Sequence, residues 1–74
     1  MGATFEQSLA SAKEALGNVT GYDEYKNYYV FYDNDRELSF DDAGILAIKK
    51  GDTRPLMFIA VINELEGEPV EHTL

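Results

Sequence analysis

The hydrophobic pattern opens with a helical stripe near the N-terminus. Apolar residues recur there at spacings of four, three and four, at Phe5, Leu9, Ala12 and Leu16. Such spacings put side chains on one face of a helix. Thr4 and Gln7 have the spacing of a capping box, and Gly17 suits the left-handed residue just past a helix end. The pattern predicts a helix over about 5–16 that packs through this stripe.

Three apolar runs after the helix favour strands, at about 25–33, 44–50 and 56–63. The first is rich in aromatic and β-branched residues, which favour strands. The second and third flank a Gly-Asp turn segment, as in a hairpin with a longer loop. Residues 18–23 have the composition of a loop. The polar residues 64–74 predict a tail, or a short edge strand beginning near Pro69.

Residues 39–51 also carry signals for a helix. Ser39 and Asp42 have capping-box spacing, and Lys49, Lys50 and Gly51 suit a helix end. Against a helix, Gly44 would lie in its interior, at a cost of about 1 kcal/mol. A strand over 44–50, a helix over this segment, and one helical turn at 39–43 followed by a strand all remain open.

These elements predict one α+β domain over residues 1–74, with one N-terminal helix packed on a three- or four-stranded antiparallel sheet. A chain of this length buries only roughly 60% of its unfolded surface, so its core is thin. We expect that core to join the helix stripe to the strands through Phe5, Leu9, Leu16, Tyr29, Phe31, Ile45 and Phe58.

The net charge of the chain limits the classes of molecule that the protein is expected to bind. The chain has 14 acidic and 6 basic residues and a formal net charge of −8. Nucleic-acid binders and proteins of anionic membranes place Lys and Arg against phosphate, so neither partner is expected. The acidity keeps a small protein soluble, or it presents an acidic face to a basic protein partner.

The cellular compartment of the protein is inferred from sequence features that are absent. There is no cysteine, and the longest apolar run, 56–62, falls short of the ~20 residues of a membrane helix. No charged segment precedes an apolar stretch in the manner of a signal peptide. These features predict a cytoplasmic protein, although a leader removed from the mature chain would leave the same sequence.

Catalytic and metal-binding residues are sparse. The single histidine, His72, lies in the predicted tail, where a fixed orientation is hard to maintain. No nucleophile or phosphate-binding motif occurs. Residues 33–41 alternate in the manner of a calcium loop, with Asp33, Asp35, Glu37, Ser39 and Asp41 at the ligand positions. Leu38 and Gly44 stand where that loop needs glycine and glutamate. We therefore expect no enzymatic activity, no metal site and no cofactor.

The tyrosines provide the candidate site. Tyr28, Val30 and Tyr32 share one side of the first predicted strand, opposite Tyr29 and Phe31. One helix covers only one face of a sheet, so we expect this second face to be open. Asp33 and Asp35 would form its polar rim, and Met57, Ile59 and Val61 would extend it.

Exposed aromatic patches mark protein interaction sites. The sequence therefore predicts a non-enzymatic protein-interaction module that binds through its Tyr-rich sheet face. The alternative is a structural homo-oligomer that buries the same face against its own copy.

The segments YYVFYDND, GILAIKKGD and LMFIAVI resemble a pattern of small bacterial proteins. They are similar to immunity proteins against polymorphic toxins and to PepSY-type domains, in both of which a helix precedes a strand meander. Tyr29 stands where the immunity proteins often have tryptophan. The resemblance implies an inhibitor or immunity-type role, and it transfers no site residues.

Overall fold

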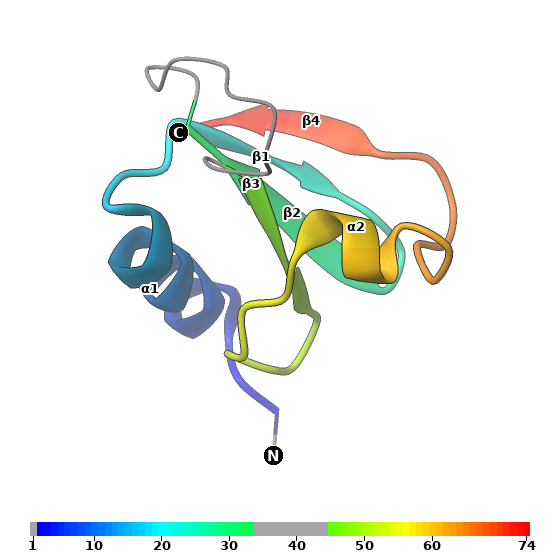
Figure 1. Cartoon of the computed structure of the whole chain (residues 1–74), viewed down its shortest axis with the longest axis horizontal. Helices are drawn as coiled ribbons and strands as arrows, with labels where there is room; N and C mark the ends of the chain where they lie inside the picture. Colours follow the sequence, from blue (N-terminus) through cyan, green and yellow to red (C-terminus); the bar gives the residue numbers. More distant parts are fainter. Residues whose placement is uncertain (1, 34–44) are drawn as a thin grey trace.

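A computed structural model describes residues 2–33 and 45–74 of the chain. The elements are α1 (Phe5–Leu16), β1 (Gly21–Glu24), β2 (Tyr28–Tyr32), β3 (Ile45–Lys49), α2 (Phe58–Val61) and β4 (Val70–Thr73). The four strands form one antiparallel sheet in the order β3-β2-β1-β4 (Figure 1). The predicted class is confirmed, since an N-terminal helix packs on a four-stranded antiparallel sheet.

Helix α1 begins and ends where its sequence predicts. The Gln7 amide donates to Thr4 Oγ1 at 3.2 Å, and the Thr4 amide donates to Gln7 Oε1 at 2.9 Å. This reciprocal pair satisfies two amides that an uncapped helix would leave without partners. At the other end, Gly17 has a φ of 88°, and its amide donates to the Lys13 carbonyl at 2.8 Å.

The first core lies between α1 and the sheet. Its buried members are Ala12, Leu16, Val19, Phe31, Leu46 and Ile48. Phe5, Leu9 and Tyr29 pack at its margin, so most of the predicted helix-to-strand packing is present. The buried Ser8 hydroxyl donates to the Asp52 carbonyl at 2.6 Å, which ties α1 to the turn after β3.

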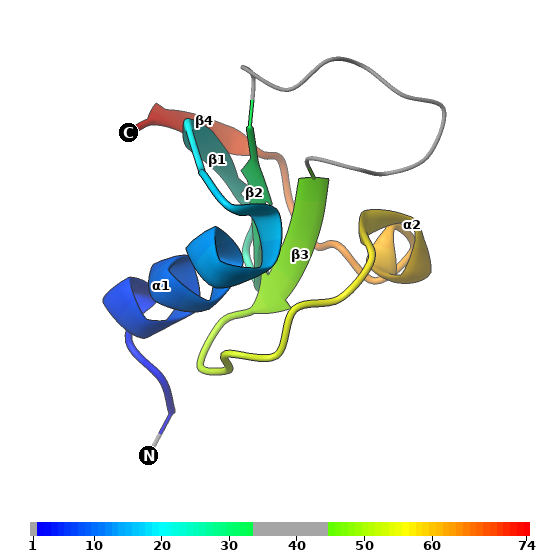
Figure 2. The same ribbon diagram turned by 60° about the vertical axis from the view of Figure 1, so that its left-hand side comes forward.

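The second face of the sheet is covered by α2, and the predicted strand at 56–63 is wrong. Leu56 exchanges two backbone hydrogen bonds with Ala47, at 2.8 and 2.9 Å, and the chain then turns into a helix. Val61 packs there against Tyr28, Val30 and Ala47. The two helices therefore enclose the sheet from opposite sides (Figure 2).

Two residues predicted for the first core belong to the second. Ile45 and Phe58 pack around Val61 and its neighbours, not under α1. Ile45 pairs with Tyr32, while the neighbouring Leu46 pairs with Phe31. Because side chains alternate along a strand, Ile45 and Leu46 point to opposite faces.

Strand β1 forms in part of the predicted loop at 18–23. Gly21 permits it, because a Cβ there would lie 2.6 Å from the Tyr32 hydroxyl and 2.8 Å from the His72 carbonyl. Only a residue without a side chain fits between these neighbours. Glycine is used here for close approach within a strand, whereas composition alone suggests a turn.

The C-terminal segment forms the edge strand that was one of its two predicted states. Val70–Thr73 pairs with Glu24–Gly21, so β4 joins β1. The helical alternative for the segment before Gly51 is excluded at Ile45–Lys49, which is a strand. The rest of that alternative, and most of the predicted calcium-like loop, fall outside the described residues.

Candidate interaction surface

Helix α2 has an outer side that packs against nothing in the described parts of the chain. Met57, Ile59 and Ile62 are exposed, with Ile59 at 63% and Ile62 at 47%. We call these three residues the α2 patch. Val61 and the half-buried Phe58 face the sheet, so the helix already contributes its share of the core. Exposed large apolar side chains are a feature of protein interaction sites.

The position of the α2 patch is fixed by the segment that follows it. The Asn27 side chain donates to the Glu64 carbonyl at 2.7 Å and accepts from the Glu66 amide at 2.9 Å. The Lys26 amide donates to the Glu66 carbonyl at 2.9 Å. The turn between β1 and β2 therefore anchors the exit of α2 against the sheet.

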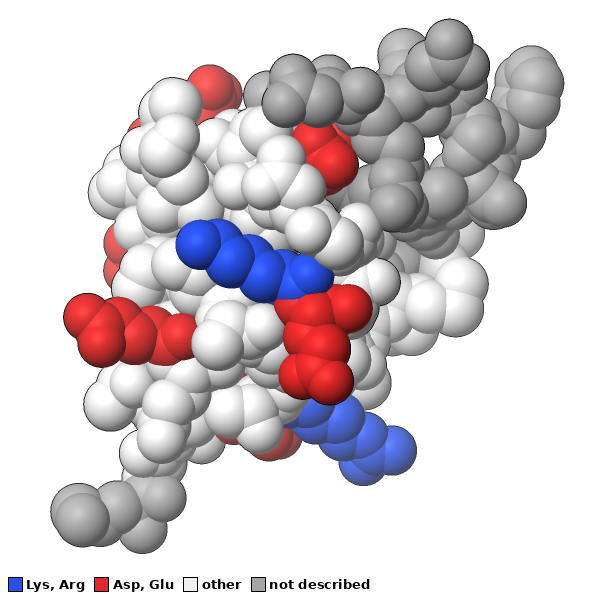
Figure 3. Space-filling model, turned by 90° about the vertical axis from the view of Figure 1, so that its left-hand side faces the viewer, with Lys and Arg blue, Asp and Glu red and all other residues white. Residues whose placement is uncertain are grey.

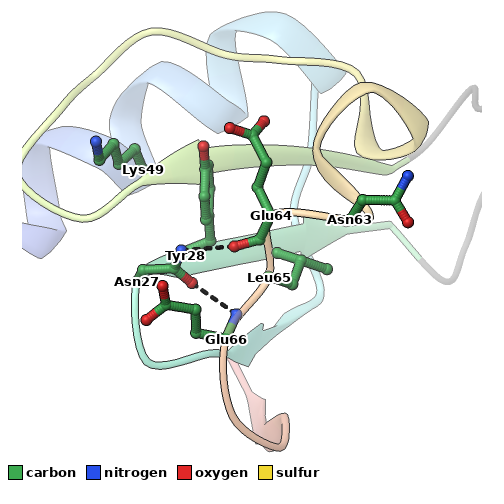
Figure 4. Close-up of a pocket in the computed structure, with 7 residues that line it drawn as sticks. All are labelled: Asn27, Tyr28, Lys49, Asn63, Glu64, Leu65 and Glu66. Carbon is green, nitrogen blue, oxygen red and sulfur yellow. Dashed lines mark hydrogen bonds between the residues drawn. The ribbon is translucent and has the colours of Figure 1, made fainter.

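An open hollow of about 330 Å³ lies beside this anchor. Its lining residues are Asn27, Tyr28, Lys49, Asn63, Glu64, Leu65 and Glu66 (Figure 4). Both polar atoms of the Asn27 amide are used by the backbone of 64–66. A ligand would therefore find the exposed side chains of Lys49 and Glu64 but not the Asn27 amide, which serves the fold.

The predicted Tyr-rich face is not open. Tyr28 is 5% exposed and Val30 is 1% exposed, because α2 covers them. Tyr32 is half-buried with its hydroxyl over Gly21, and Asp33 is half-buried beside it in sequence. Asp35 lies outside the described residues. The prediction of an exposed face is therefore wrong at Tyr28 and Val30.

Two residues expected to extend that face do reach the surface. Met57 and Ile59 are exposed, whereas Val61 is buried. The sequence held a signal for this, since Ile59 and Ile62 are three residues apart, as on one side of a helix. A run as apolar as 56–62 hides that period, because nearly every position in it is hydrophobic.

A polar cluster occupies the margin of the opposite face, where α1 ends its cover of the sheet. Glu24 Oε2 lies 2.8 Å from Lys50 Nζ, and Glu24 Oε1 lies 3.2 Å from His72 Nε2. The His72 ring stacks on Tyr22, with ring centres 4.7 Å apart and planes at 18°. The hydrogen bond from Lys50 holds the pKa of Glu24 below its usual value, with His72 adding to the effect.

His72 is thus held in a strand, not in a frayed tail. A carboxylate beside an imidazole is a common element of acid–base chemistry. Here the groups against His72 are the Glu24 carboxylate and the Tyr22 ring, which join β4 to β1. These contacts hold β4 against β1.

On the other face, β1 and β4 place two acids directly opposite each other. Asp23 pairs with Glu71 across the strands. Burial, together with the Glu71 charge, raises the pKa of Asp23. Burial and the charges of Glu71 and Asp23 also raise the pKa of the Tyr32 hydroxyl.

Replacing Asp23 with asparagine should therefore stabilise the protein at neutral pH, by roughly 0.2–1 kcal/mol for a like-charge cross-strand pair. Because the pKa of Asp23 is raised in the folded state, its ionisation opposes folding as pH rises through that value. The gain from Asp23→Asn should vanish below pH 3.8, the ordinary pKa of aspartate, where the carboxyl is protonated folded or unfolded. Thermal melts of the wild type and of Asp23→Asn at pH 3 and pH 7 measure the gain in stability at each pH. An equal gain at the two pH values would contradict the predicted pH dependence.

Charge on the surface is distributed unevenly. On the side where α1 lies, uncharged residues cover much of the described surface, and acidic and basic side chains are interspersed (Figure 3). The segment leaving α2 carries three exposed acids, Glu64, Glu66 and Glu68. The α2 patch is thus followed along the chain by negative charge.

Comparisons of the chain with protein-family models, with curated proteins and with solved structures find no significant match. No helix in the described ranges, 2–33 and 45–74, is long and apolar enough to cross a membrane.

Proposed function

We propose that this protein is a non-enzymatic interaction module that binds a basic protein through the α2 patch. The observation that carries the proposal is the exposure of Met57, Ile59 and Ile62, on helix α2 and at its two caps, when the helix already packs Phe58 and Val61 in the core. The fold does not require apolar residues at these three positions, and polar ones would keep the surface more soluble.

The kind of partner follows from charge. The chain has a net charge of −8, and Glu64, Glu66 and Glu68 follow the patch. An apolar patch followed along the chain by acids complements an apolar surface rimmed by Lys and Arg, since opposite charges speed encounter and exclude other partners. A basic enzyme or toxin held inactive by such contact would make this an inhibitor of the immunity type, which the resemblance also implies.

A non-catalytic role is supported by the shape of the surface. The hollow beside Asn27 is open to solvent, and the Asn27 amide is engaged by the backbone. Enzyme sites usually surround their substrate in a concave pocket that contains convergent polar groups. The alternative, self-association through the Tyr-rich face, is not supported, because Tyr28 and Val30 of that face are buried.

The proposal is tested with the double variant Ile59→Ser/Ile62→Ser. The wild-type protein is immobilised and exposed to an extract of the source organism at physiological salt. Each protein that it retains is purified, and its binding to the wild type and to the double variant is measured by calorimetry. We expect a basic partner whose Kd rises at least about tenfold with the double variant, a loss of about 1.4 kcal/mol or more.

The control is Ala10→Ser/Ala15→Ser, which introduces two serines on the exposed side of α1. It should bind as the wild type does. A partner that binds the Ile59→Ser/Ile62→Ser protein with unchanged affinity would show that the α2 patch is not the binding surface.

A further inference from the structure

The two edges of the sheet differ in how their backbone groups are used. On the outer edge of β3, the amide and carbonyl of Ala47 both bond to Leu56, and the Lys49 carbonyl accepts from the Asp52 amide at 2.9 Å. On the outer edge of β4, no described residue supplies such a partner. Among the described residues, the β3 edge is therefore covered at Ala47 and Lys49, while β4 is paired on one side only.

The hydrogen-bond pattern shows which residues of β4 face outward. The Tyr25 amide donates to the Tyr28 carbonyl at 2.8 Å, so the odd-numbered residues of β1 bond to β2 and the even-numbered ones to β4. The Leu74 amide accordingly donates to the Thr20 carbonyl at 3.0 Å. Val70 and His72, opposite Glu24 and Tyr22, bond inward in the same way. The amides and carbonyls of Glu71 and Thr73 are left pointing outward.

We propose that a second copy of this chain docks on β4, strand against antiparallel strand, with Glu71 of each copy opposite Thr73 of the other. The outward groups of Glu71 and Thr73 then exchange both N–H···O bonds at each of the two symmetry-related pairs. The result is one sheet that runs continuously through two molecules.

The sequence of β4 selects this register over one of its neighbours. Symmetric pairing requires outward residues to lie opposite outward residues, and one of the two neighbouring registers sets Glu71 against its own copy and Pro69 against Thr73. That register opposes two like charges, and Pro69 has no amide hydrogen to donate. The register with Glu71 opposite Thr73 avoids both.

The same register pairs the exposed apolar residues of the strand. Val70 falls opposite Leu74 of the second copy, and both are exposed in the single chain. His72 falls opposite its own copy. Each chain has a net charge of −8 and the strand is short, so the association is weak and strengthens as salt screens the repulsion.

Single cysteines test the register, because the chain has no cysteine of its own. Residues opposite each other in a non-hydrogen-bonded pair have Cβ atoms about 4.5–5.5 Å apart, close to the separation in a disulfide. His72→Cys should therefore form a covalent dimer under an added oxidant at least about tenfold faster than Glu71→Cys or the exposed α1 control Glu14→Cys. The readout is a non-reducing gel at matched concentration and high salt, with circular dichroism to confirm folding.

Dimer formation at one common rate for the three variants would overturn the proposal. So would Glu71→Cys as the fastest, because that result belongs to the rejected register.

Reversible association is tested by charge at position 73, which is exposed in the single chain. Thr73→Lys sets a cation opposite Glu71 of the second copy, and Thr73→Glu sets an anion there. Sedimentation equilibrium should show dimer dissociation constants that fall and rise, respectively, by a factor of about three to ten, as expected for cross-strand charge pairs.

Glu14→Gln changes the net charge by the same amount as Thr73→Lys and should tighten the dimer less. Equal effects of these two variants, or a wild type that stays monomeric at millimolar concentration in high salt, would contradict self-pairing and leave the edge to a strand of another protein.

Discussion

Phe31→Ala is expected to remove a large part of the protein's stability. Phe31 is fully buried, at 0% exposure, and its ring lies 5.6 Å from that of Tyr22 and 6.0 Å from that of Phe5. Removing a buried phenylalanine ring costs about 3–5 kcal/mol. A chain of this length is stable by roughly 4–11 kcal/mol, so the loss is a large share of the total. Guanidinium titration followed by circular dichroism measures it.

Ile59→Ala is the matched control, because it removes an apolar side chain of similar size from an exposed position. Its free energy of unfolding should stay within about 0.5 kcal/mol of the wild type. If Phe31→Ala and Ile59→Ala shifted the unfolding midpoint equally, the core between α1 and the sheet would be misplaced.

Tyr28→Ser should be almost as damaging, on the other face of the same strand. The Tyr28 ring packs with Val30, Ala47 and Val61 beneath α2, so its loss opens a cavity worth about 2–5 kcal/mol. Tyr28→Phe keeps the ring and should retain most of the stability. Because burial raises the pKa of the Tyr28 hydroxyl, the wild type should also resist alkaline titration at this position.

Urea titration of the two variants separates the ring from the hydroxyl. A Tyr28→Ser protein as stable as the wild type would contradict the packing of α2 on Tyr28. It would support the open sheet face that the sequence predicts.

The sequence predicts α1 well because its signals are local and agree with one another. The capping box of Thr4 and Gln7, the apolar stripe and Gly17 each specify the same helix. Strand β2 is equally clear, because Tyr28–Tyr32 is made of residues that favour strands. Both elements would be assigned without knowledge of their neighbours.

The missed elements depend on partners distant in the sequence. Gly21–Glu24 has the composition of a turn and becomes a strand because β2 and β4 pair with it on both sides. Leu56–Ile62 suits a buried strand as well as a short helix. It bridges to Ala47 only at Leu56, and Phe58–Val61 is helical. The candidate site therefore differs from the predicted Tyr-rich face, because α2 buries Tyr28 and exposes Ile59.

The strand order β3-β2-β1-β4 also has a consequence for how the molecule opens. Strands β1 and β2 are joined by a tight turn, whereas β4 comes from far along the chain to pair with β1. Closing such a distant pair costs more chain entropy than closing a hairpin. Its amides should exchange with solvent deuterium well before those of β2, which both helices shield. Strand β4 should therefore detach from β1 and pair again while the rest of the protein stays folded.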